Sequence, residues 1–197
     1  MANEQLQVMA RKGHLFIISG PSGTGKSTIV HATLEKRPKL GYSVSCTTRP
    51  PRVDEEDGVD YYFISEETFR KKVDADELAE WAEVHGHLYG TPARYIEETL
   101  AAGQDVLLDL DVEGTKRLSN RYSEAISVFI APPTMTELER RLDRRGTDSP
   151  EVVARRLKGA EVEMAQVQSY DHVIVNDDLA QALLKLETII EKVCLHG

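Results

Sequence analysis

Residues 14–28 read HLFIISGPSGTGKST, and this stretch decides the fold. Residues 14–19 form a short apolar run, which is typical of a buried parallel strand. Residues 20–27 match the pattern G-x-x-x-x-G-K-[ST], in which glycines let successive backbone N–H groups surround phosphate oxygens. The helix predicted over residues 27–36 points its positive end at the same phosphates. The stretch therefore predicts a nucleotide-phosphate site between a strand and a helix, with Lys26 reaching the phosphates and the Ser27 hydroxyl binding Mg²⁺.

Strands and helices alternate along most of the remaining chain. Apolar runs predict strands at residues 42–46, 61–64, 106–111, 125–130 and 173–175. Helices are expected at residues 65–73, 92–102, 136–145, 150–168 and 179–195. Thr91 before Pro92 is expected to cap the second of these, and Gly103 to end it. The alternation predicts an α/β fold of the P-loop NTPase type, a parallel sheet flanked by helices.

One interval breaks this alternation. Residues 47–60 are rich in proline, arginine and acidic residues and are expected to form a loop, while residues 78–89 mix short strand and turn signals. We interpret the interval from about residue 43 to 89 as an inserted lobe.

Composition restricts the classes of partner. The 197 residues carry a net charge of −9, which disfavours binding to nucleic acid or to an anionic membrane. No apolar run approaches the roughly 18–20 residues that a membrane span needs, and residues 1–12 do not resemble a secretory signal. Cys46 and Cys194 are far apart in sequence, so they predict neither a metal-binding motif nor a disulfide framework. We expect a cytoplasmic protein.

Two pairs of charged residues extend the predicted site. Asp109 and Asp111 close the strand predicted at residues 106–111, where a carboxylate of a P-loop enzyme helps to hold Mg²⁺. Residues two apart in a strand face the same way, so both are expected to point into the site. Arg49 and Arg52 lie three apart in a loop; they are suited to gripping a second phosphate, although a solvated pair is the alternative.

Several motifs then follow in a distinctive order. They are SVSCTTRPPR at residues 43–52, EEDGVDYYF at 55–63, EWAE at 80–83, YGT at 89–91, DLD at 109–111 and VIVNDD at 173–178. In this order and spacing the sequence resembles the guanylate kinases, from about residue 13 to 195. The resemblance implies transfer of the γ-phosphate of ATP to GMP, and to dGMP, with Mg²⁺ as cofactor. It also implies one domain, residues 1–197, acting as a monomer or homodimer. Within it, the core covers about 13–42, 92–132 and 170–197, a GMP-binding lobe about 43–91 and a lid about 133–169.

The resemblance also implies roles for individual residues. The expected ATP-binding residues are Gly20, Pro21, Ser22, Gly23, Thr24, Gly25, Lys26, Ser27, Thr28 and Asn176, the last near the adenine. The expected GMP-binding residues are Ser45, Arg49, Arg52, Tyr61, Glu80, Tyr89, Thr91, Asp109 and Asp111. Glu80 would accept hydrogen bonds from guanine N1–H and the 2-amino group. The expected catalytic residues are Lys26, Arg49, Arg141, Arg145 and Arg156, and the expected metal ligands are Ser27 and Asp109. The metal and base roles of Asp109 and Asp111 stay open.

The sequence departs from the family pattern at three positions. Asp54 stands where a glycine is common, Thr91 replaces a serine, and Glu113 replaces a glutamine. Asp54 adds a negative charge near the expected GMP phosphate.

Three other readings are compatible with a phosphate loop. A non-catalytic guanylate-kinase-like module is disfavoured because Lys26, Ser27, both loop arginines and the lid arginines are all present. A P-loop kinase for another acceptor is disfavoured by the expected guanine-binding residues, Glu80 above all. A P-loop regulator or NTP hydrolase would leave the acceptor residues unexplained.

Overall fold

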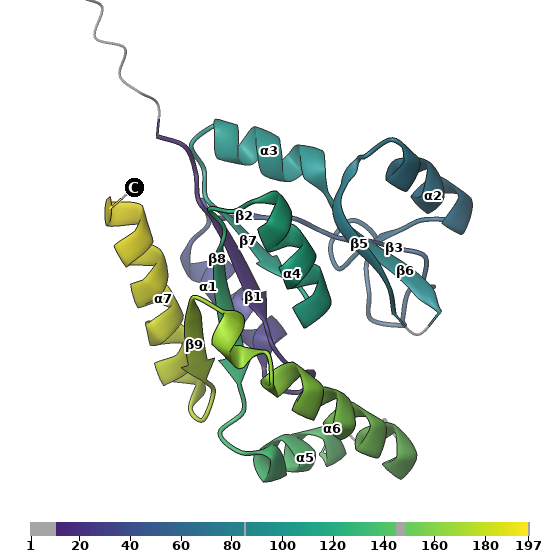
Figure 1. Cartoon of the computed structure of the whole chain (residues 1–197), viewed down its shortest axis with the longest axis vertical. Helices are drawn as coiled ribbons and strands as arrows, with labels where there is room; N and C mark the ends of the chain where they lie inside the picture. Colours follow the sequence, from purple (N-terminus) through teal and green to yellow (C-terminus); the bar gives the residue numbers. More distant parts are fainter. Residues whose placement is uncertain (1–10, 85, 145–148, 197) are drawn as a thin grey trace, which may run out of the picture.

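A five-stranded parallel sheet forms the centre of the computed structural model, which describes residues 11–84, 86–144 and 149–196. The strand order is β2-β7-β1-β8-β9, and every neighbouring pair is parallel. The strands are β1 (Leu15–Ser19), β2 (Gly41–Tyr42), β7 (Val106–Asp109), β8 (Ile126–Ala131) and β9 (His172–Val175). The inner strands are continuous apolar runs because helices cover both faces of the sheet (Figure 1).

Two pairs of helices enclose this sheet. On one face α1 (Lys26–Lys36) and α7 (Leu179–His196) contribute Ile29, Leu186 and Ile190 to the same buried cluster as the strands. On the other face α3 (Ala93–Ala101) and α4 (Val112–Arg121) contribute Ile96 and Leu118. The α/β fold class predicted from the alternation is confirmed. In the described ranges, no helix combines the length and apolarity that crossing a membrane requires.

A second sheet projects from one side of the first (Figure 1). Its order is β4-β3-β6-β5, built from β3 (Cys46–Thr47), β4 (Tyr62–Phe63), β5 (Leu78–Val84) and β6 (His87–Pro92). Helix α2 (Glu66–Asp74) covers it with Phe69, and Ser65 caps this helix by accepting a hydrogen bond from the Thr68 N–H.

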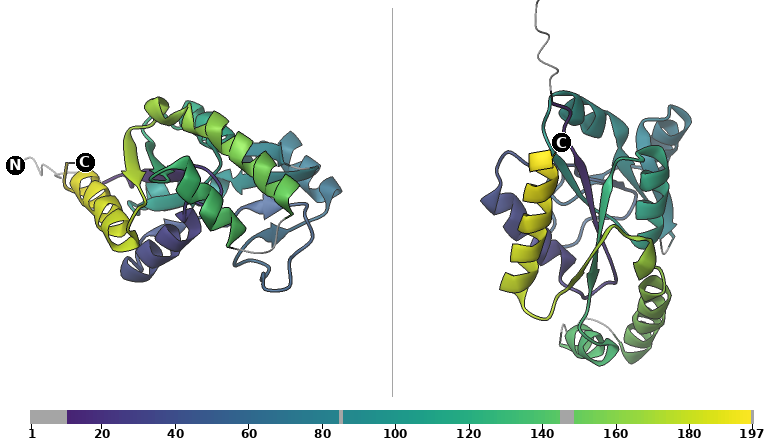
Figure 2. Two further views of the ribbon diagram at one scale, coloured as in Figure 1. Left: turned by 90° about the horizontal axis from the view of Figure 1, so that it is seen from below. Right: turned by 60° about the vertical axis from the view of Figure 1, so that its left-hand side comes forward.

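A helical arm leaves the main sheet after β8 and returns at β9. It holds α5 (Met135–Asp143), α6 (Pro150–Met164) and a 3₁₀ turn, η1 (Val167–Ser169). The two helices pack through Leu138, Leu142, Val153 and Ala160. Figure 2 shows this pair below the carboxyl ends of the strands, on the side away from the chain termini.

Three sequence predictions about local structure are wrong. The strand expected at 42–46 is two strands in different sheets, since β2 pairs with β7 and β3 pairs with β6. The strand expected to reach residue 111 ends at Asp109, because Asp111 caps α4. Thr91 is not a helix cap: it lies in β6, Pro92 precedes the first residue of α3, and the Thr91 hydroxyl is used by Glu80.

Candidate active site

The phosphate loop connects β1 to α1, and its shape depends on glycine. Gly20, Gly23 and Gly25 have φ angles of 131°, 90° and 89°, a region that L side chains rarely adopt. A Cβ added at Gly20 would lie 2.3 Å from the Ile130 carbonyl oxygen on β8. The loop is therefore in close contact with the neighbouring strand β8. Thr24 closes the turn through a 2.8 Å hydrogen bond from its hydroxyl to the Pro21 carbonyl.

Lys26, Ser27 and Asp109 meet at the start of α1. The Lys26 ammonium donates to the Gly20 carbonyl at 2.8 Å, which folds the side chain back over the loop. Burial raises the pKa of Asp109, while the Lys26 charge and a hydrogen bond from Ser27 act against that rise. A hydroxyl and a carboxylate are oxygen donors of the kind that Mg²⁺ takes, so Ser27 and Asp109 fit the expected cofactor.

Asn176 fixes the far side of the loop. Its side-chain amide donates to the Thr24 carbonyl at 2.7 Å, its backbone N–H donates to Ala131, and the residue is 6% exposed. The side chain also packs against Gly25, where an added Cβ would lie 2.5 Å from its Nδ2. Sequence reasoning assigned Asn176 to the adenine; that contact stays a prediction, and the structure adds a role in shaping the phosphate loop.

Replacing Asn176 tests this role. Asn176→Ala leaves the buried Thr24 carbonyl without its donor, so we expect the free energy of unfolding to fall by about 1–3 kcal/mol. ATP affinity should fall with it, because the loop loses its fixed shape. Urea unfolding and nucleotide titration measure both quantities. The exposed Asn120 on α4 provides the control, since Asn120→Ala should change neither; equal effects of the two substitutions would contradict the role.

The second sheet holds an arginine inside a ring of aromatic residues. The Arg49 Nε donates to the Tyr89 hydroxyl at 3.1 Å, and its guanidinium carbon lies 5.6 Å from the centre of the Tyr61 ring. The Tyr61 and Tyr89 rings meet edge to face, 5.8 Å apart. The structure thus brings Arg49, Tyr61 and Tyr89 together as the sequence predicted, at a place suited to one anion.

Glu55 organises this cluster, and sequence reasoning missed it. One carboxylate oxygen accepts from Arg49 Nη2 at 2.8 Å, and the other accepts from the Arg52 backbone N–H at 2.8 Å. The hydrogen bond from Arg49 lowers the pKa of Glu55. The Arg52 side chain is 73% exposed against 13% for Arg49, so the two arginines are not equivalent. The sequence did contain a signal for Glu55, because this residue begins the motif at residues 55–63 that resembles the guanylate kinases.

A buried carboxylate lies beside this cluster. Glu80 on β5 is 8% exposed, and its Oε1 accepts a 2.7 Å hydrogen bond from the Thr91 hydroxyl on β6. A Cβ added at Gly114 would lie 3.2 Å from Glu80 Oε2 and 3.0 Å from Asp111 Oδ1, so the two acids face a common space at the start of α4. Asp111 itself accepts from the Gly114 N–H. Ser45 precedes β3, and its carbonyl accepts from the Tyr62 N–H.

The environment of Glu80 makes stability depend on pH. Burial raises the Glu80 pKa, the Thr91 hydrogen bond opposes the rise, and the Asp111 charge adds to it. A raised acid pKa means that folded protein binds more protons than unfolded protein, so stability falls as pH rises above the ordinary value of 4.5. We therefore expect Glu80→Gln to raise the free energy of unfolding at pH 8 and to show no gain below pH 4.5. Denaturant titrations at both pH values measure this; a gain that does not depend on pH would contradict it.

The three arginines expected in the lid, Arg141, Arg145 and Arg156, differ in how far the structure describes their surroundings. Arg141 donates to Glu137 at 2.8 Å and to the Asn176 carbonyl at 3.0 Å, which links α5 to Asn176, the residue that holds Thr24 of the phosphate loop. Hydrogen bonds from Arg140 and Arg141 lower the pKa of Glu137 to about 2. Arg156 lies half-buried in α6. Arg145 lies outside the described residues, so its predicted role stays a prediction.

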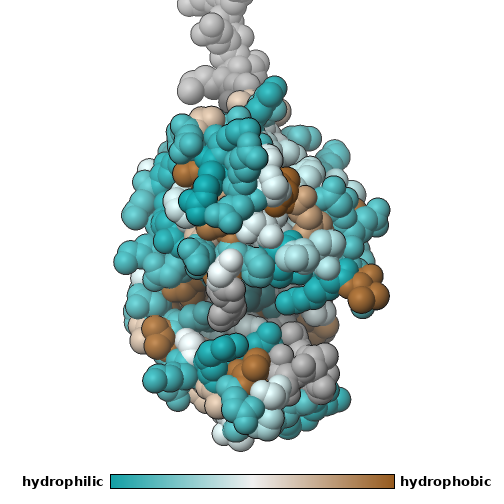
Figure 3. Space-filling model, turned by 90° about the vertical axis from the view of Figure 1, so that its right-hand side faces the viewer, coloured by the Kyte–Doolittle hydropathy of each residue, from teal (hydrophilic) through white to brown (hydrophobic). Residues whose placement is uncertain are grey.

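Asp109 links the two sides of this region. Burial raises the pKa of Tyr61, which directly precedes β4, and the Asp109 charge adds to that rise, while Asp109 itself accepts a hydrogen bond from Ser27 and lies near the Lys26 charge. Asp111, two residues later, acts on Glu80. Asp109, at the end of β7, therefore lies beside the phosphate loop, and Asp111, which is exposed, lies near the buried carboxylate of Glu80. Figure 3 shows the face of the molecule that carries the second sheet. This face is mainly hydrophilic, with scattered hydrophobic residues.

Comparison with known proteins gives one consistent result. The guanylate kinase family model matches residues 12–193. A guanylate kinase of Symbiobacterium thermophilum is 52% identical over 91% of this chain and 85% of its own, and one of Geobacter sulfurreducens is 46% identical over 92% and 90%. A crystal structure of guanylate kinase from Anaplasma phagocytophilum superposes with a TM-score of 0.79 at 32% identity, covering 95% of this chain and 89% of the other. The chain belongs to the guanylate kinase family.

Proposed function

We propose that this member of the guanylate kinase family transfers the γ-phosphate of ATP to GMP, and to dGMP, giving ADP and the corresponding diphosphate for guanine nucleotide recycling. The observation that carries the proposal is the pairing of two sites across the segment 109–111. On one side lie the phosphate loop and Asp109, and on the other lie Glu80 and Asp111.

Glu80 is the residue that we assign to guanine. Guanine presents N1–H and the 2-amino group on one edge, and a carboxylate accepts both. Adenine lacks these two donors, so AMP would leave a buried carboxylate unpaired, which discriminates by factors up to about 10⁴. Thr91 holds one oxygen of Glu80 at 2.7 Å and so fixes the plane of the acceptor. Ser45 and Asp111 complete the base pocket in this proposal.

Arg49 is the main ligand that we assign to the GMP phosphate. Its guanidinium is already oriented by Tyr89 and Glu55, and little rotamer freedom is lost when an anion binds. Tyr61 and Tyr89 offer hydroxyl donors beside it. Arg52 is exposed, and we propose that it reaches the same phosphate from the rim.

The acceptor is a phosphate oxygen that is anionic near neutral pH, so the reaction needs no strong general base. The chain's task is to align two polyanions and to compensate charge on the migrating group. In this proposal residues 20–28 bind the ATP phosphates through their backbone N–H groups, which Pro21 alone lacks, and through the Lys26 ammonium. Arg141, Arg145 and Arg156 approach from the lid. Ser27 and Asp109 would hold Mg²⁺, which supplies positive charge to the phosphates.

Water must be kept from the donor phosphate. We propose that residues 43–91 act as a GMP-binding lobe and residues 133–169 as a lid, and that both close over the core 13–42, 92–132 and 170–197 when ATP and GMP are bound. Small-angle scattering should show a smaller radius of gyration with both nucleotides than with either one; no compaction would contradict closure.

A nucleotide panel tests the function. With ATP and Mg²⁺, ADP release should be fast with GMP and dGMP and slow with AMP or UMP. Release without any acceptor would instead favour an NTP hydrolase, and no release with any acceptor would favour a non-catalytic module. We further propose that the protein is cytoplasmic, because Cys46 and Cys194 are free thiols of the kind found in reducing compartments. The resemblance to the guanylate kinases is the basis for proposing a monomer or a homodimer.

A further inference from the structure

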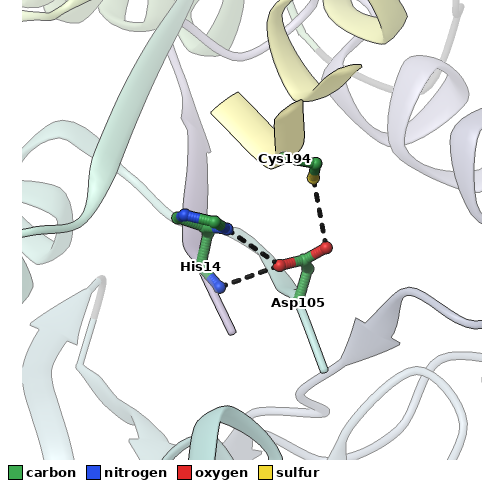
Figure 4. A group of neighbouring side chains, drawn as sticks. All are labelled: His14, Asp105 and Cys194. Carbon is green, nitrogen blue, oxygen red and sulfur yellow. Dashed lines mark hydrogen bonds and ion pairs between the residues drawn. The ribbon is translucent and has the colours of Figure 1, made fainter. Parts of the chain in front are cut away.

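A second group of side chains with metal-ligand chemistry lies at the opposite end of the main sheet from the phosphate loop. His14 directly precedes β1, Asp105 directly precedes β7, and Cys194 lies in the last turn of α7. Figure 4 shows the three side chains pointing toward one another, although 91 residues separate His14 from Asp105 and 89 separate Asp105 from Cys194.

The distances within this group suit one small ion. His14 Nδ1 lies 3.1 Å from Asp105 Oδ1, and Cys194 Sγ lies 3.2 Å from Asp105 Oδ2. One ligand atom from each residue lies within 4.8 Å of the other two. Neighbouring ligands of a tetrahedral zinc ion are about 3.3–3.8 Å apart, given bond lengths of roughly 2.0–2.3 Å. Small side-chain movements are therefore enough to place all three around a common centre.

We propose that His14, Asp105 and Cys194 bind one Zn²⁺ ion, with solvent as the fourth ligand. The combination of imidazole, carboxylate and thiolate selects zinc over Mg²⁺ or Ca²⁺, which prefer oxygen donors alone. Binding replaces the thiol proton of Cys194, which leaves to solvent. The ion would join the amino ends of two strands to the last helix, so its expected effect is on stability and not on phosphoryl transfer.

The surroundings of Asp105 favour such an ion. The His14 backbone N–H donates to Oδ1 at 2.9 Å, which orients the carboxylate as an outer hydrogen bond does in known metal sites. His14 and Asp105 are 19% and 17% exposed at their side chains. Asp105 also lines a cavity of about 340 Å³ together with Arg37, Lys39 and Ile190.

Arg11 is the group that the ion must replace. Its Nη2 lies 2.9 and 3.1 Å from the two Asp105 oxygens and 3.2 Å from His14 Nδ1. The Arg11 side chain is 42% exposed, so its guanidinium can turn into solvent when an ion takes its place beside Asp105, which is 17% exposed. A guanidinium and a divalent cation compete for the same acceptors, so a substitution of Arg11 should change the metal affinity of the site.

Cobalt binding tests the proposal on the full chain. Metal-free protein titrated with Co²⁺ should bind one equivalent and develop a thiolate-to-cobalt charge-transfer band, and Zn²⁺ should displace the ion. Cys194→Ser should abolish the band and weaken Zn²⁺ binding at least about tenfold. Cys46 remains in this variant as an internal control, because it is buried in the second sheet away from the cluster.

Any other outcome of the cobalt titration would overturn the proposal. A band that persists in Cys194→Ser would assign the metal to Cys46, and no band in the unchanged chain would leave only a hydrogen-bond network at Asp105. Circular dichroism checks that the variant folds. If it does not, Arg11→Gln provides a second measurement: it should tighten Zn²⁺ binding by removing the competing charge, and unchanged affinity would contradict the site. GMP phosphorylation should be the same with and without one equivalent of Zn²⁺, so this test is independent of the proposed function.

Discussion

Lys26→Ala is expected to lower kcat for phosphoryl transfer from ATP to GMP by about 10³-fold, the usual loss when a preorganised charge on a transition state is removed. Lys26 lies at the first position of α1, and its ammonium already reaches over the loop to Gly20. In the proposed mechanism the loop surrounds the oxygens that carry the charge of the migrating phosphoryl group, so alanine would leave that charge uncompensated. Steady-state kinetics with saturating nucleotides measure the loss.

A basic residue elsewhere on the same helix provides the control for Lys26. Lys36 ends α1, is 57% exposed at its side chain and pairs with Glu187 at 3.4 Å. Lys36→Ala removes the same charge from the same helix, and it should leave kcat within about twofold. If Lys26→Ala kept more than a tenth of the activity, the assignment of the loop to the donor phosphates would be wrong.

Glu80→Gln is expected to lower kcat/KM for GMP by about 10²–10⁴-fold and to leave ATP affinity unchanged. The carboxylate would accept two hydrogen bonds from guanine, and bonds to a charged group contribute about 1.5–3 kcal/mol each. Glutamine keeps the shape and the bond from Thr91, but it offers one acceptor and one donor where guanine presents two donors. Kinetics with GMP, together with titration of a non-hydrolysable ATP analogue, separate the two substrates.

Glu83 is the matched control, since it lies on the same strand and is exposed. Glu83→Gln removes one negative charge from β5 and should change neither substrate. Equal losses for GMP and ATP in Glu80→Gln would show that the residue supports the fold and does not select the base. AMP use should not improve by more than about tenfold, because glutamine does not create the complement of adenine.

Most of the fold could be predicted because its signals are local. Apolar runs mark the strands of the main sheet, and the glycine pattern at residues 20–27 marks the phosphate loop, whose φ angles only glycine adopts readily. The predictions failed where long-range pairing decides the outcome. Residues 42–46 read as one strand, yet Tyr42 pairs with Leu107 and Cys46 with Gly90, because two different sheets compete for a short extended segment.

The residues of the candidate site also fall into those that the sequence predicted and those that only the structure revealed. Residue types and spacing singled out Lys26, Arg49 and Asp109, since each carries its chemistry in its own side chain, and the resemblance to the guanylate kinases added Glu80. Glu55 and Glu137 were not singled out, because an acid acquires a positioning role only from the arginines that fold against it. The adenine assignment of Asn176 said nothing of the Thr24 carbonyl, 152 residues away, to which its amide donates.

By itself, the sequence determined the family, the parallel sheet, the phosphate loop and the chemical types of most site residues, because these depend on local geometry and on groups that a residue carries with it. Only the tertiary structure decided which groups share a space: Glu80 with Thr91 and Asp111, and His14 with Asp105 and Cys194. Distance along the chain does not encode distance through the fold, and Cys194 shows this most directly: its spacing from Cys46 predicts no metal-binding motif, yet its sulfur lies 3.2 Å from Asp105. A side chain's partners, exposure and pKa follow from that packing.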